Sequence, residues 1–293
     1  LALAYALAAR RMTGQEAQLG GGVSSIGGNA SFYRPPVSSS FVRPSPMRSL
    51  LWQQFRQTAP IAIPLCLITL LMTAFYLGSG NDPGDRPGFY ILTRGLAPMS
   101  ITLTASWLGV LTFYGDNVRR RSEFFGDRGM SPGLVWWTRL IPTLSWFFGL
   151  SLILFLGLWF TGYTDPWFAW SDAVSLFLSA SVLFAFGQLV AQWVRRPVLA
   201  FLAAPAYAWI CMMWMFYWLY EVQDLHQGVF QWMALATPIL LFASWRLSQR
   251  WLEGHEGGRY AIRVVAYTLL AVIVPCVLGS MPAIVSGVAK LLG

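Results

Sequence analysis

The side chains that most often do chemistry in proteins are few in this chain and far apart. In 293 residues it has one lysine, two histidines and three cysteines: Lys290, His226, His255, Cys66, Cys211 and Cys276. A Gly-x-x-x-x-Gly-Lys phosphate-binding loop needs a lysine after two spaced glycines, and Ala289 precedes Lys290, so the chain cannot form one. The cysteines stand singly within apolar stretches, which favours a role as small apolar fillers. We therefore predict no catalytic site, bound cofactor or metal in this chain, and no enzyme activity of its own.

The composition predicts a membrane protein. Hydrophobic residues make up 56% of the chain and charged residues 11%, and the mean hydropathy is +0.54, outside the range of soluble domains. Apolar stretches long enough to cross a hydrocarbon core of roughly 30 Å recur along the sequence. None alternates with the period of a membrane β-strand, so we predict an all-α polytopic fold. The predicted spans are 59–79, 96–115, 135–162, 173–194, 198–220, 229–248 and 262–287.

Basic residues predict the orientation of these spans. Seventeen of the 20 lysines and arginines fall on one side, whereas the 12 acidic residues divide six and six. By the positive-inside rule the basic side is cytosolic. The cytosolic segments are then 10–58, 116–139, 195–197 and 246–263, in a multi-pass protein of the plasma (inner) membrane. This orientation accounts for the net charge of +8 without a nucleic-acid partner, and it places the two histidines on opposite sides, where they cannot share a metal or a catalytic triad.

The segments outside the central spans have distinct compositions. Residues 1–11 are apolar and end in two arginines, so we interpret them as the end of a preceding membrane helix and the chain as a fragment. Residues 12–46 are rich in Gly, Ser and Pro, which is typical of a flexible cytosolic linker. In 47–58, apolar and polar residues alternate as in an interfacial helix, although a cytosolic extension of the first span remains an alternative. Residues 251–293 are predicted to form a cytosolic loop and an additional span.

A polar segment between the second and third spans is the strongest candidate for a functional site. In 117–130, an Arg-Arg-Arg cluster is followed by residues that suit a short amphipathic helix under the membrane. Its apolar face would carry Phe124 and Phe125, and its charged face Glu123, Asp127 and Arg128. Ser131-Pro132 then reads as an N-cap and first helical residue that begin the third span. The alternative is a basic juxtamembrane loop held by anionic lipid.

Polar residues inside the predicted spans are scarce. No Asp, Glu or Lys lies near mid-span, and Asp116 and Asp172 stand at helix ends. This disfavours a proton- or ion-coupled carrier, which usually keeps an ionisable group near mid-membrane. Gln188 and Gln192 are four residues apart on one helical face. We expect them to hold helices together, with pore lining as the alternative.

Taken together, these features resemble one half of an ABC-2-type ABC transporter permease. The resemblance covers 47–250, as a six-span unit with both ends cytosolic, and rests on this topology and on the sequence from Arg121 to Trp137. In that family the helix before the first span is the elbow helix, here 47–58. The helix between spans two and three is the coupling helix that docks on the ATPase, here 117–130. The seventh span, and the short 221–228 loop where the family often has re-entrant helices, depart from the pattern.

The resemblance implies that the chain couples and conducts while catalysis takes place elsewhere. A nucleotide-binding ATPase subunit or domain would bind ATP and Mg, and a second permease half or a second copy of this chain would complete the pathway across the lipid bilayer. Glu123, Phe124, Phe125, Asp127 and Arg128 would form the contact with the ATPase. The competing interpretations are a non-transport membrane scaffold or assembly subunit, and an ion-coupled carrier.

Overall fold

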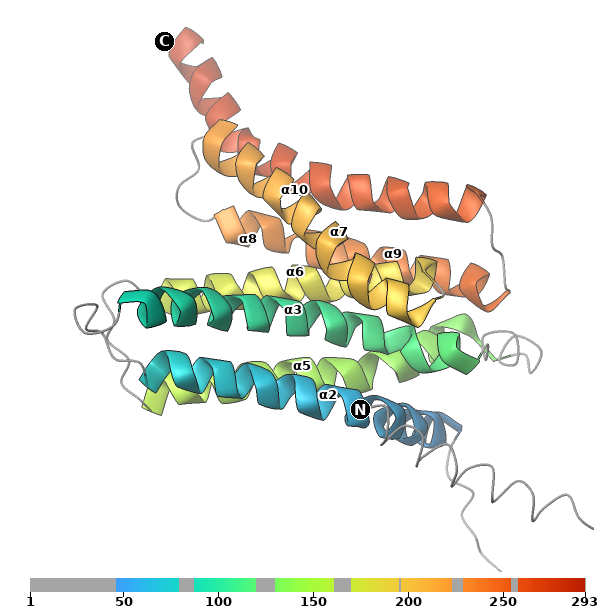
Figure 1. The fold of residues 1–293 in the computed structure, drawn as a ribbon. Helices are drawn as coiled ribbons and strands as arrows, with labels where there is room; N and C mark the ends of the chain where they lie inside the picture. The colour runs from blue at the N-terminus through green and yellow to red at the C-terminus, as the bar shows by residue number, and fades with distance from the viewer. Residues whose placement is uncertain are drawn as a thin grey trace, which may run out of the picture. The chain divides into compact units, whose positions relative to one another are not determined.

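The computed structural model describes residues 46–78, 87–119, 130–160, 170–194, 196–222, 229–253 and 258–292, and the regular structure in these ranges is helical throughout. Six helices are long and apolar enough to cross a membrane. They are α2 (Pro46–Gly78), α3 (Pro87–Arg119), α5 (Pro132–Phe160), α6 (Trp170–Trp193), α7 (Pro197–Tyr217) and α10 (Gly258–Leu292). The protein is therefore an all-α, multi-pass membrane protein, as the composition predicted (Figure 1).

Prolines mark where several helices start. α2, α3, α5 and α7 each begin at a proline, whose fixed φ suits the first helical position and whose missing N–H costs nothing there. At the other end of α7, a π-helical turn, η1 (Trp218–Val222), continues the chain. Other prolines stand inside helices, for example Pro98 in α3 and Pro142 in α5. Such interior prolines are tolerated in membrane helices because neighbouring groups satisfy the freed carbonyl.

The sixth predicted span, 229–248, is divided into two helices. These are α8 (Val229–Ala234) and α9 (Ala236–Leu252), with a turn at Leu235 between them. Pro238 explains the break, because it cannot donate to the carbonyl of Ala234 and its ring would clash with that group. Neither piece is long enough to cross a membrane alone, but together they run opposite in direction to α7 and α10 (Figure 1). The predicted span 229–248 is therefore not a single membrane-crossing helix in the structure.

The predicted interfacial helix 47–58 is continuous with the first span. α2 runs without interruption from Pro46 past Pro60, which is the arrangement expected of a helical extension. Its polar residues do not all face water, because Gln54 and Thr58 are buried. The alternation of polar and apolar residues in this segment thus reflects packing against α3 as well as exposure.

α3 and α6 form the centre of the bundle. In these two helices 61% and 67% of the membrane-crossing stretch is buried, against 33% or less in the other four. Their backbones approach closely at two glycines, since a Cβ at Gly109 would collide with the carbonyl oxygen of Phe184 and one at Gly187 with that of Ser106. Small residues at a helix crossing allow this kind of approach in membranes. The surrounding helices instead expose large apolar side chains such as Leu67, Phe148 and Leu202, as lipid contact requires.

Candidate functional site

The predicted coupling residues Glu123, Phe124, Phe125, Asp127 and Arg128 lie outside the described residues, as do residues 1–45. The structure does describe what flanks the coupling segment. α3 ends at Arg119 on one side, and α5 begins at Pro132 on the other. The predicted start of α5 is confirmed, because the Oγ of Ser131 accepts a hydrogen bond from the N–H of Leu134 at 3.4 Å. A serine at the N-cap satisfies one of the amides that a helix start leaves without a partner.

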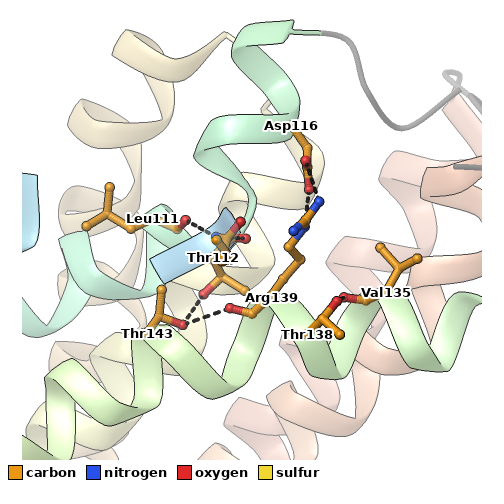
Figure 2. A network of polar contacts seen from close by, with 8 residues as sticks. Leu111, Thr112, Asp116, Val135, Thr138, Arg139 and Thr143 are labelled. Atoms are coloured by element: carbon orange, nitrogen blue, oxygen red, sulfur yellow. Dashed lines mark hydrogen bonds and ion pairs between the residues drawn. The ribbon is translucent and has the colours of Figure 1, made fainter. Parts of the chain in front are cut away.

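A buried ion pair joins the two helices that flank this segment. The Nε of Arg139 in α5 donates to Oδ2 of Asp116 in α3 at 2.7 Å, and its Nη2 donates to Oδ1 at 3.0 Å. Both side chains are fully buried. The guanidinium therefore meets the carboxylate through two parallel bonds (Figure 2), the strongest geometry available to such a pair.

This pair corrects the sequence interpretation of Arg139, which was counted among the cytosolic arginines although its side chain lies inside the helix bundle. Asp116 stands near the end of α3, as predicted, and its side chain is buried as well. Each is tolerated there because the other neutralises it; a single charge in such surroundings would be strongly disfavoured. The sequence held one signal for the pair. Arg139 stands a full two turns inside α5, too far along to belong to the basic cluster at 119–121.

Hydroxyl and amide groups extend the connection to α2. The Oγ1 atoms of Thr112 in α3 and Thr143 in α5 lie 3.0 Å apart, one helical turn from the ion pair on each helix. From α2, Nε2 of Gln54 donates to the carbonyl oxygens of Leu111 and Thr112 at 3.2 and 3.1 Å. Three helices are thus linked by directional contacts at one level of the bundle. We call Gln54, Thr112, Asp116, Arg139 and Thr143 the polar joint.

Gln188 and Gln192 are both buried in α6 but differ in their contacts. Nε2 of Gln192 donates to the carbonyl oxygen of Ser244 in α9 at 3.0 Å, and the Oγ of Ser244 accepts from Nε1 of Trp136 at 3.0 Å. Gln192 therefore connects α6 to α9, the role in helix association that we expected. The side-chain amide of Gln188 makes no hydrogen bond with a described residue. Neither glutamine lines a cavity described below.

Two apolar cavities lie along α3 and α6, toward the opposite end of α3 from the polar joint. The first, about 260 Å³ and partly open, is lined by α2, α3, α5 and α6, with Ile101 and Phe177 in its wall. The second, about 430 Å³ and also partly open, is lined by α3, α6, α7 and α8, with Met212 and Phe230 in its wall. Pro98 of α3 and Leu176 of α6 border both. Any movement of α3 relative to α6 at this level would change the shape of both cavities.

The described part of the chain offers electrostatic and packing contacts. In the described ranges, no three His, Cys, Asp or Glu side chains come close enough to hold a metal ion. The three cysteines are free, and Cys276 is buried. The polar joint can fix the relative positions of three helices, and the cavities can accommodate apolar groups. Comparison with known proteins found no family model, no curated protein and no solved structure that matches this chain.

Proposed function

We propose that this chain is the membrane-spanning permease component of an ATP-driven ABC transporter in the plasma (inner) membrane. A separate nucleotide-binding subunit or domain binds and hydrolyses ATP with Mg, and a second permease half or a second copy of this chain completes the pathway. The observation that carries the proposal is the polar joint. It joins α3 to α5 through Asp116, which directly precedes the segment 117–130 proposed to contact the ATPase, and Arg139, two turns inside the helix that follows it.

The polar joint connects segment 117–130 mechanically to the helices that line the two cavities. When the ATPase subunit closes on ATP, segment 117–130 is displaced, and α3 and α5 follow it. Because Asp116 and Arg139 hold these helices together, they move as one body instead of sliding past each other. α3 is packed backbone to backbone on α6 at Gly109 and Gly187, so the displacement reaches the walls of both cavities. Interfaces of this kind transmit movement because packed cores are not continuously deformable.

The test is whether an ATPase co-purifies with the chain. The full-length protein is purified from native membranes in mild detergent, and ATP hydrolysis by the preparation is measured. The variant Phe124→Ala with Phe125→Ala is compared with Phe242→Ala, which removes an exposed aromatic ring of α9. We expect the double variant to lose the partner and the ATPase activity and Phe242→Ala to keep both. A wild-type preparation with no nucleotide-hydrolysing partner would contradict the proposal and favour the scaffold interpretation.

An ion-coupled carrier is the second candidate, and the burial of Asp116 is the observation that favours it. A carboxylate inside a bundle is the group to which a transported proton or cation usually binds. Uptake into vesicles separates the two candidates. The permease needs ATP for uptake, whereas a carrier takes up substrate on an imposed proton or sodium gradient without nucleotide and loses this uptake in Asp116→Asn.

A further inference from the structure

A groove between α9 and α10 is lined by three arginines, with the carboxylate of Glu253 at its edge, where it accepts a hydrogen bond from Gln249 at 3.1 Å. The groove has a volume of about 450 Å³ and is bordered by three arginines, Arg246 and Arg250 of α9 and Arg263 of α10. Arg246 and Arg250 are four residues apart, so their side chains leave the same face of α9. None of the three forms a salt bridge with a described residue, and no carboxylate lines the groove. Like charges that border one groove repel each other, and an anion bound between them would lower that repulsion.

The groove changes from polar to apolar along α10. Arg263, Tyr267 and Leu270 follow each other at four and three residues, which places them in a row on one face of the helix. Beyond Leu270, the exposed face of α10 continues through Ile273 and Val277, which are 47% and 48% exposed. A soluble anion would need only the arginines. A phosphate that carries acyl chains would use both the arginines and the apolar face that follows.

We propose that this groove binds the phosphate of an anionic phospholipid. The guanidinium groups of Arg246, Arg250 and Arg263 surround the phosphate, Tyr267 offers a hydrogen-bond donor at the groove wall, and the acyl chains lie against the exposed apolar face of α10. Arginine suits this task because its planar fork can donate two bonds to one phosphate. Basic pockets between membrane helices bind anionic head groups in this way. The site is independent of the proposed transport function.

The experiment counts bound lipids on the purified full chain by native mass spectrometry during titration with phosphatidylglycerol or phosphatidylcholine. Each basic residue near a membrane surface contributes about 1 kcal/mol to anionic lipid binding, a factor of about five in affinity. Arg246→Gln with Arg250→Gln should therefore weaken phosphatidylglycerol binding roughly 25-fold. The matched control is Arg56→Gln with Arg196→Gln, which removes two exposed arginines on helices that do not line the groove and should change binding much less.

Several results would overturn the proposal. Equal binding of phosphatidylcholine and phosphatidylglycerol would show that the groove does not distinguish a zwitterionic from an anionic head group. An equal loss of phosphatidylglycerol binding in the control variant would show that only the overall charge of the protein matters. Displacement of phosphatidylglycerol by inorganic phosphate alone would assign the groove to a soluble anion. If the glutamine pair fails to fold, Arg246→Lys with Arg250→Lys keeps the charges and removes the two-bond geometry. It should still weaken binding several-fold, and unchanged binding would contradict the arginine contacts.

Discussion

The energetic coupling between Asp116 and Arg139 can be measured directly. Asp116→Asn leaves the Arg139 guanidinium buried without a counter-charge, and Arg139→Gln leaves the carboxylate in the same condition. Removing one partner of a buried pair typically costs about 3–5 kcal/mol. At roughly 2–4 °C for each kcal/mol in a chain of this size, a loss of about 3 kcal/mol lowers the unfolding midpoint by about 6–12 °C. Both single variants should therefore melt well below the wild type when intrinsic tryptophan fluorescence is followed in detergent.

The double variant decides whether the two side chains act as a pair. With Asp116→Asn and Arg139→Gln together no uncompensated charge remains, so its destabilisation should be far smaller than the sum of the two single losses. Glu253→Gln is the control, because it changes an exposed carboxylate that accepts from Gln249 on the same helix, and it should hardly move the midpoint. Additive losses in the double variant, or single variants as stable as Glu253→Gln, would refute the ion pair as the clamp between α3 and α5.

Three further predictions concern the crossing of α3 and α6, the coupling segment and the topology. Gly187→Ala places a methyl group against the Ser106 carbonyl and should destabilise the protein by about 1–3 kcal/mol, whereas Gly149→Ala meets open space and should be neutral or stabilising in the same unfolding assay. Phe124→Ala with Phe125→Ala should weaken co-purification of the ATPase at least about thirtyfold, as expected for buried interface aromatics, without lowering the unfolding midpoint. Gly258→Cys, on a background without native cysteines, should resist an impermeant thiol reagent added to intact cells; rapid labelling would reverse the predicted orientation.

Hydropathy predicted most of the fold because the bilayer imposes a strong and local requirement. A helix that must cross about 30 Å of hydrocarbon needs some twenty apolar residues in succession, and such stretches are visible without knowledge of the partners. The break at Leu235 can also be explained from the sequence. Pro238 stands well inside the predicted span 229–248, and a proline there removes a backbone hydrogen bond to Ala234.

The polar joint could not be predicted in the same way. The position of Arg139 two turns inside α5 sets it apart from the basic cluster, but the sequence does not name its partner, and only the packing of α3 beside α5 brings it within 2.7 Å of Asp116. The contacts of Gln192 and Gln188 could not be predicted from the sequence either. Their spacing predicted a shared helical face, but whether each meets an acceptor depends on what α3 and α9 present at that level.

The distribution of polar contacts suggests why one end of this bundle could drive the other. Around Asp116, the helices α2, α3 and α5 are held by bonds with defined directions, and separating them would leave charged or amide groups unsatisfied in an apolar interior. Toward the opposite end, α2 and α3 share one hydroxyl contact, between Thr69 and Thr104 at 2.7 Å, and most side chains that line the cavity around Ile101 and Phe177 are apolar. Apolar surfaces can repack at lower cost, because dispersion contacts have no fixed direction. A displacement applied beside the polar joint would therefore be carried along α3 and absorbed where the cavities lie, which is where the proposed transport function requires a change of shape.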